Sequence, residues 1–308
     1  MQAQFTFATN ADNTLTVIRY SGGGAVIVPT NVNGSIVTSI GDGAFFDCFN
    51  VDSVTIPDTV TNIGETAFRF SGLTSITIPG SVSSIGGGAF SSCWSLTNAT
   101  LDNGVTSIGE YAFQGCFGLI QVTIPDSVTS IGEDAFAGCI TLTNVTIPRS
   151  VTSIGSAAFS DDPLTNIIIP GSVTSIETNA FQDLFALRSV YFQGNAPLVE
   201  SSVFTNDNAT VYYLPGTTGW SSPFAGLPAV LWNPLIQTAD ASFGVHSNQF
   251  GFNITGTTNI PIVVEACTNL ANPVWTPLQV LTLTNGLFYF SEPLKTNSPG
   301  RFYRISSP

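Results

Sequence analysis

An internal repeat of 22 or 23 residues constrains this chain more than any other feature. The dipeptide Ala-Phe recurs in steps of 23, 22, 23, 23, 23 and 22 residues, at Ala44-Phe45, Ala67-Phe68, Ala89-Phe90, Ala112-Phe113, Ala135-Phe136, Ala158-Phe159 and Ala180-Phe181. Ile-Gly and Ile-Pro dipeptides recur in the same register. A unit this short cannot cover its own apolar side chains, so it is stable only when it stacks on neighbouring copies. The sequence therefore predicts a mainly β solenoid.

Each coil of the solenoid is expected to contain the same local structures. In one copy a strand is expected over residues 142–148, where apolar and polar residues alternate until a proline ends the pairing. A second short extended piece follows over residues 150–154, and Ala158-Phe159 are expected in one helical or 3₁₀ turn. Phe113 and Phe136 should be fully buried in the same slot of adjacent coils, because coils contact only their neighbours.

The repeat resembles the leucine-rich repeat of BspA-like, treponemal-type bacterial surface proteins. The shared positions are L-x-x-V-x-I-P, I-G-x-x-A-F and a trailing cysteine, and they cover residues 36–215. The resemblance implies a curved solenoid with a β-sheet on its concave side, and a secreted or cell-surface protein that binds other proteins. Enzymatic activity is not typical of such repeats, so we expect no catalytic residues and no cofactor.

The two ends of the repeat region depart from its pattern. Residues 1–35 contain three apolar, alternating segments and are expected to form an N-terminal β cap. Residues 216–232 are expected to cap the other end, with Trp220, Phe224 and Trp232 covering the apolar face of the last coil.

A separate β-sandwich-like module is expected over residues 233–308, where the repeat register ends. Five strands are predicted, over residues 250–254, 262–266, 278–283, 287–290 and 302–305. Asn285-Gly286 between two of them predicts a β-hairpin. Residues 264–270, Trp275 and residues 301–304 resemble a small β-sandwich module that ends many secreted proteins of environmental Gram-negative bacteria.

The composition excludes several classes of function. The formal net charge is −13, so a nucleic-acid backbone would be repelled. No apolar run is long enough to predict a membrane span. The chain has one histidine, His246, which excludes the usual histidine-based triads and His-rich metal sites that do not involve it. The chain opens directly into a strand, so we expect an exported mature domain whose signal peptide is absent from this sequence.

Four cysteines occupy one position of the repeat, three residues after its phenylalanine: Cys48, Cys93, Cys116 and Cys139. They could form a line of disulfides or metal ligands, or a buried row of thiols. The buried row is favoured, because Cys48 lies two coils from Cys93 and a straight row cannot surround zinc tetrahedrally. We therefore expect no metal site.

Four acidic residues also share one position, directly after the repeat glycine: Asp42, Glu65, Glu110 and Glu133. Such a row could hold calcium, or place two carboxyl groups at the spacing that glycoside hydrolysis needs. A solvated row on the surface is favoured, since any repeat with an acid in its consensus produces this spacing.

The outward side of the predicted long strand carries the candidate binding residues. Its last outward position is occupied by Thr55, Thr77, Thr100, Thr123, Thr146, Ile168, Tyr191 and Tyr213 in successive coils. β-propensity alone could explain this row. A graded binding surface is the alternative, with Ile168, Tyr191 and Tyr213 as an apolar strip, Arg188 at its rim, and Thr77, Thr100, Thr123 and Thr146 as the polar part.

Three functions stay open at this point. The favoured one is a protein-binding or adhesion module with an unidentified protein ligand. The second is a self-assembling envelope or filament component, in which the chain associates with copies of itself. Carbohydrate binding is the third, because rows of threonine also suit glycans. The C-terminal module could instead cover the apolar strip, which would make the strip an internal interface.

Overall fold

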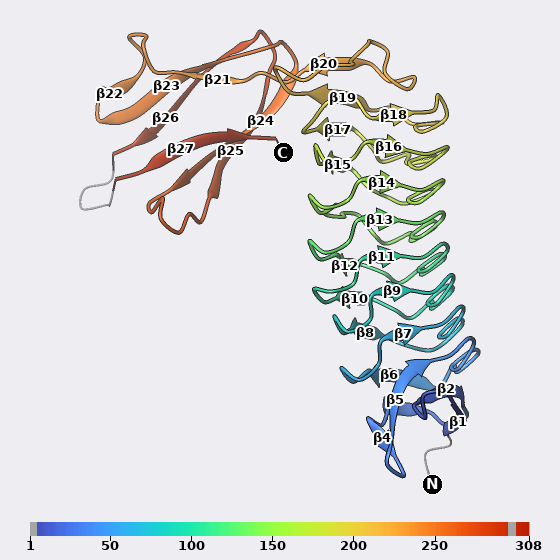
Figure 1. Cartoon of the computed structure of the whole chain (residues 1–308). Helices are drawn as coiled ribbons and strands as arrows, with labels where there is room; N and C mark the ends of the chain where they lie inside the picture. Colours follow the sequence, from blue (N-terminus) through green and yellow to red (C-terminus); the bar gives the residue numbers. More distant parts are fainter. Residues whose placement is uncertain (1–4, 295–299, 308) are drawn as a thin grey trace. The chain divides into compact units, whose positions relative to one another are not determined.

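The computed structural model describes residues 5–294 and 300–307, and the chain divides into two compact units. The first unit contains the chain up to Val211 together with Thr218–Pro228. The second contains Tyr212–Thr217 and the chain from Ala229 onward. The first unit is the predicted solenoid, in which successive coils stack along one direction (Figure 1).

The N-terminal cap begins with β1 (Phe5–Thr9) and β2 (Leu15–Tyr20), which pair in antiparallel fashion. Two further strands, β3 (Gly24–Ile27) and β4 (Asn31–Val32), precede β5 (Ser35–Ile40). β2 pairs in parallel with β5 and so joins the cap to the stack. The three strands predicted for this cap are confirmed.

One face of the solenoid is built from one longer strand per coil. β6 (Val51–Thr55), β8 (Ser75–Ile78), β10 (Asn98–Leu101) and β12 (Gln121–Thr123) form a parallel sheet with β3. β15 (Asn166–Ile169) and β17 (Ser189–Phe192) pair in parallel further along, and β19 (Thr210–Tyr213) follows them in the chain. The expected strand over residues 142–148 is wrong, because this coil carries no assigned strand there and the sheet is interrupted.

The second face is built from two-residue strands, all but the last of which carry the repeat isoleucine. These are β7 (Asn62–Ile63), β9 (Ser84–Ile85), β11 (Ser107–Ile108), β13 (Ser130–Ile131), β14 (Ser153–Ile154), β16 (Ser175–Ile176) and β18 (Leu198–Val199). They pair in parallel from coil to coil and continue the sheet that β1, β2 and β5 begin. The isoleucines point inward and are buried, which confirms the second extended piece of the repeat.

The Ala-Phe segment is not the helical turn that the sequence predicts. It consists of successive tight turns, because a residue with positive φ stands before the alanine and another stands two positions after the phenylalanine. In one coil these residues are Thr66 (φ 52°) and Phe70 (φ 58°). A regular right-handed helix cannot accommodate this alternation. Instead, the N–H of Phe68 donates to the carbonyl of Ala89 in the next coil at 2.7 Å.

The repeat phenylalanines form one continuous column inside the solenoid. Phe113 and Phe136 are fully buried, and their rings lie 5.4 Å apart with an angle of 1° between planes. Along the column from Phe45 to Phe204 the ring centroids are 4.8 to 5.6 Å apart. The predicted burial of these residues in one slot is confirmed, and the column sets the spacing of the coils.

Aromatic side chains close the C-terminal end of the first unit. The ring of Phe192 lies 5.0 Å from that of Trp220 and 5.6 Å from that of Phe224. Trp232, predicted as part of this cap, belongs to the second unit, where its Nε1–H donates to the carbonyl of Pro261 at 2.8 Å.

The second unit contains two antiparallel sheets. β21 (Leu235–Gln237) and β22 (Gly244–His246) pair with the two ends of β23 (Gln249–Thr255), which also pairs with β26 (Leu287–Pro293) along its whole length. β24 (Ile260–Cys267) lies between β25 (Thr276–Leu283) and β27 (Phe302–Ser306), and β20 (Ala229–Leu231) opens the unit's main segment. The rings of Phe252 and Tyr303 meet between the sheets at 5.6 Å. All five strands predicted for this module are confirmed.

The hairpin predicted at Asn285-Gly286 is wrong. The tight turn exists, with Gly286 at a φ of +74°, but β25 pairs with β24 whereas β26 pairs with β23. The turn therefore carries the chain from one sheet to the other. A local turn signal determines the reversal of the chain, and the choice of partner strand depends on which apolar face must be covered.

Candidate functional site

The outward face of the long strands is the candidate binding surface, and its polar part lies where the sequence predicts. Thr77 pairs with Thr100, which pairs with Thr123, so the three hydroxyl-bearing side chains lie side by side on adjacent strands. Thr77 and Thr123 are exposed and Thr100 is half-buried. A second row of polar residues runs beside them, with Ser75, Asn98 and Gln121 in matching register. We call these two rows the hydroxyl face.

The hydroxyl face extends beyond these strands in both directions. Ile27 of β3 is the register partner of Thr55 and is 74% exposed, so an apolar residue begins the row. At the other end Thr146 is exposed, but it lies in the coil that forms no long strand.

The predicted apolar strip does not form a continuous exposed surface. Ile168 and Tyr191 are register partners on β15 and β17, as expected. Ile168 is 40% exposed, but Tyr191 is only 5% exposed, because all four residues of β17 are buried on both faces. Tyr213 is half-buried and belongs to the second unit. Arg188 is exposed and directly precedes β17.

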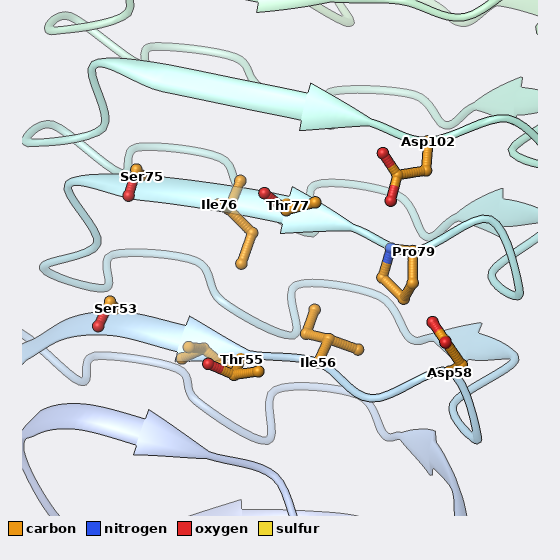
Figure 2. Close-up of a pocket in the computed structure, with 10 residues that line it drawn as sticks. Ser53, Thr55, Ile56, Asp58, Ser75, Ile76, Thr77, Pro79 and Asp102 are labelled. Atoms are coloured by element: carbon orange, nitrogen blue, oxygen red, sulfur yellow. The ribbon is translucent and has the colours of Figure 1, made fainter.

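A hollow of about 390 Å³ lies on the hydroxyl face, over the first coils of the solenoid. Its walls include Ser53, Thr55, Ile56, Asp58, Ser75, Ile76, Thr77, Pro79 and Asp102. Figure 2 shows Asp58 and Asp102 on either side of Pro79, beyond the ends of the strands that carry the hydroxyl groups. The walls can donate hydrogen bonds through hydroxyls and accept them through hydroxyls and carboxylates, an arrangement that suits a polar partner.

Asp58 and Asp102 are the site residues that the sequence reasoning missed. Asp102 follows Leu101 at the position where most coils have proline, so a break in the Ile-Pro series marks it. Asp58 follows such a proline, and Arg149 stands at the same position four coils later. Both carboxylates and Arg149 are exposed. The face is therefore acidic over its first coils and carries basic side chains, Arg149 and Arg188, further along.

Three of the four repeat cysteines form the predicted buried row of thiols, whereas Cys48 is half-buried. All five cysteines of the chain are free, and Cys93, Cys116 and Cys139 are fully buried. Each Sγ–H donates to the carbonyl of the repeat phenylalanine in the preceding coil, at 3.1 Å in Cys93 and Cys116 and at 3.4 Å in Cys139. Burial raises the pKa of Cys93 to about 11 and raises those of Cys116 and Cys139 as well. These thiols are therefore unreactive structural donors.

Two aspartates replace the cysteine in coils that are one residue shorter after the phenylalanine. Asp162 accepts a hydrogen bond from the N–H of Cys139 at 2.7 Å, and Asp207 accepts one from the N–H of Leu184 at 2.8 Å. The second carboxyl oxygen of each residue is buried without a hydrogen-bond partner. Burial raises the pKa of Asp162 well above its usual range and that of Asp207 to about 7.

The acidic row lies on the surface, as predicted. Asp42, Glu65, Glu110 and Glu133 are all exposed. Some of them link neighbouring coils, since Asp42 accepts from the N–H of Glu65 at 2.8 Å and Glu133 accepts from the hydroxyl of Tyr111 at 2.9 Å. Within residues 5–294 and 300–307, no group of three or more His, Cys, Asp or Glu side chains is placed to hold a metal ion. His246 is exposed at the end of β22.

Comparison with known proteins identifies the family to which the repeats belong. Six copies of the "BspA type Leucine rich repeat region" match residues 30–129 and 106–219, which together span more than half of the chain. No match was found among curated proteins. In the described part of the chain, no helix has the length and apolar character needed to cross a membrane.

Three solved leucine-rich repeat structures are similar to this chain. A leucine-rich repeat protein from Bacteroides ovatus is 25% identical, covers 69% of this chain and 70% of its own, and has a TM-score of 0.50. A leucine rich cell surface protein from Faecalibacterium prausnitzii is 26% identical, with 70% of each chain covered and a TM-score of 0.46. The leucine rich repeat protein of T. pallidum is 24% identical, with 69% of this chain and 84% of its own covered and a TM-score of 0.37.

Proposed function

Because the chain belongs to the BspA-type leucine-rich repeat family, we propose that it is a secreted or cell-surface module that binds a protein partner through the hydroxyl face. The observation that carries this proposal is the register of the long strands. Thr77, Thr100 and Thr123 lie in one row beside a second polar row, on a face that also contains the hollow. Solenoids of this kind typically serve as non-enzymatic binding scaffolds, and we assign no catalytic residue.

The charge on the face indicates which partner surfaces fit. Asp58 and Asp102 lie at the hollow, and no basic side chain is among the residues that line it. A partner with lysine or arginine side chains would meet complementary charge there, whereas an acidic partner would be repelled, also by the net charge of −13. Association should therefore slow as ionic strength rises.

Export is part of the same proposal. The family resemblance indicates a surface or extracellular protein. A chain with a single lysine and an acidic composition fits this setting. Detection of the protein in the cell-surface or culture fraction of its source would support export, and its confinement to the cytosol would refute it.

Capture from a surface-protein extract of neighbouring cells tests the proposal, provided that matched variants are compared. Thr77→Arg with Thr100→Arg places bulk and positive charge on the hydroxyl face. Asn62→Arg with Ser84→Arg makes the same change at exposed positions of β7 and β9, on the other sheet. We expect the first pair to reduce a captured protein at least tenfold and the second pair to leave it unchanged. Equal effects from both pairs would refute the assignment of the face.

Self-association is the second candidate function, and one observation favours it. β18 is the last strand of the sheet formed by the short strands, and its Leu198 is 80% exposed. An exposed strand edge with an apolar side chain can pair with another copy. Light scattering as a function of concentration tests this function, since growth into large species would support assembly and a constant monomer mass would refute it.

A further inference from the structure

A row of exposed apolar side chains follows one edge of the solenoid, at positions that do not belong to the hydroxyl face. It lies in the turns between the Ala-Phe segments and the long strands. We call the row the aromatic edge. It consists of the exposed residues Phe46, Phe49, Trp94, Phe117, Ile120 and Ile140, together with the half-buried Phe70, whose ring contacts those of Phe46 and Trp94. Phe49, Trp94, Phe117 and Ile140 are 59%, 52%, 47% and 57% exposed, and all four stand directly after a repeat cysteine. Soluble monomers rarely expose a contiguous apolar surface of this kind without a binding role.

The rings of the aromatic edge are oriented differently from those of the interior column. Phe46 and Phe70 lie 5.7 Å apart at an angle of 82°, and Phe70 and Trp94 lie 5.7 Å apart at 60°. In the interior, by contrast, Phe90 and Phe113 stack at 8°. Stacked rings cover each other's faces, whereas rings turned out of parallel leave a face available to a ligand.

The polar groups around the aromatic edge are mostly neutral. Ser92, Ser95, Gln114 and Thr141 lie in the same turns. The guanidinium of Arg69 lies 4.8 Å from the centre of the Phe70 ring, and its Nε–H is buried without a hydrogen-bond partner. The edge thus combines ring faces with neutral hydrogen-bonding groups. A ligand with apolar faces and many hydroxyl groups would satisfy both features.

The spacing of the coils then identifies the ligand class. Successive coils in this region are 4.8 to 5.4 Å apart, as measured between the stacked phenylalanines from Phe45 to Phe136. Each sugar of an extended β-1,4-linked hexose chain advances by nearly the same length. We propose that the aromatic edge binds a neutral, linear β-1,4-linked polysaccharide, with about one sugar per coil. This role goes beyond the proposed protein-binding function and uses different residues.

The aliphatic C–H faces of such sugars would pack on the rings of Trp94, Phe117 and Phe49. Their equatorial hydroxyl groups would reach the serine, threonine and glutamine side chains nearby. A neutral glycan is favoured over an acidic one, and over a membrane with anionic lipids, because the chain carries a net charge of −13.

Calorimetric titration of the intact chain tests the proposal. The probes are cellohexaose and chitohexaose, with maltohexaose as an α-linked control whose curved chain does not match the coils. We expect both β-linked hexasaccharides, or one of them, to bind at least tenfold more tightly than maltohexaose. A difference between the first two identifies the sugar type. Affinity should rise with oligosaccharide length and level off near the pentasaccharide, because the edge spans five coils.

Matched variants locate the binding. Trp94→Ala with Phe117→Ala should lower the affinity at least tenfold with little change in the melting temperature, because about half of each side chain is exposed. Tyr111→Ala removes an exposed aromatic residue that lies outside the edge, and it should leave binding unchanged. The proposal is overturned if no β-linked oligosaccharide binds, if maltohexaose binds equally well, or if the edge variants abolish protein capture or self-association and leave glycan binding intact.

Discussion

The two units of this protein differ in what determines the environment of a side chain. In the solenoid, a residue's position in the repeat suffices, since Phe113 and Phe136 have the same neighbours one coil apart and are equally buried. In the second unit no position recurs. There Asn285-Gly286 forms the predicted turn, yet the strands on either side of the turn join different sheets. In a repeat protein, the position of a residue in the repeat determines which residues it contacts in neighbouring coils. In a β-sandwich, the pairing of strands depends on the sequence of the whole module.

The comparison predicts that damage to the solenoid spreads along the stack of coils. Phe136→Ala should lower the free energy of unfolding by roughly 3–5 kcal/mol, because it empties a closed slot in the aromatic column. Hydrogen exchange should accelerate in the coils of Phe113 and Phe159, while the amides of β23 and β24 keep their protection. Phe117→Ala, on the exposed edge, is the control and should have little effect. An unchanged melting temperature for Phe136→Ala would contradict the column's structural role.

A smaller change in stability, in this case a gain, is expected for a substitution at Asp162, where the coil departs from the repeat pattern. Burial raises the pKa of Asp162, so the folded protein holds this proton more tightly than the unfolded chain. The stabilising contribution of Asp162 is therefore full below pH 3.8 and is lost as the pH rises through the raised pKa. Asp162→Ser introduces the residue that another short coil, that of Ser71, has in this slot.

This substitution should raise the free energy of unfolding at neutral pH by about 1–3 kcal/mol, the usual penalty for an uncompensated buried polar group. The gain should disappear below pH 3.8, where the carboxyl group is protonated in both states. Asp126→Ser, at an exposed position, is the control. Chemical denaturation across this pH range provides the measurement. A pH-independent difference would show that the carboxyl charge is not the cause.

The smallest effect is expected in the second unit, at the turn that the sequence identified correctly. Gly286→Ala should destabilise this unit by roughly 1–2 kcal/mol, because an L-residue is strained at positive φ. The added β carbon would also lie 2.7 Å from the carbonyl of Gly256. Gly300→Ala has open space around it and should be neutral. If thermal unfolding shows equal stability for both variants, the turn does not depend on glycine.

The period of the repeat predicts most of the first unit, including the buried column, the two series of parallel strands and the row of thiols. The helical turn fails because non-glycine residues such as Tyr111 and Asp134 adopt positive φ, and their identity gives no sign of it. The role of Asp162 escapes prediction because it arises from the loss of one residue from its coil. In each case the structure depends on backbone conformation rather than on the apolar pattern.

The candidate site also contains residues that the sequence pattern predicts and residues that it does not. Thr77, Thr100 and Thr123 lie where the alternation of the strand places them, because outward positions follow directly from the inward ones. The burial of Tyr191 does not follow from the repeat pattern, since β17 differs from the other long strands in being covered on both faces. The hollow with Asp58 and Asp102 was also missed, because its two carboxylates come from turns that lie two coils apart.

Photocrosslinking of a bound partner tests most directly whether the hydroxyl face is the binding surface. A photoreactive phenylalanine analogue would be placed at Thr77, on the hydroxyl face, or at Asn62, on the other sheet, and irradiated in the presence of the surface-protein extract. Both positions are exposed, so neither substitution should disturb the fold. The account predicts a covalent adduct from position 77 and none from position 62. An adduct from position 62 alone would contradict the assignment of the hydroxyl face as the binding surface.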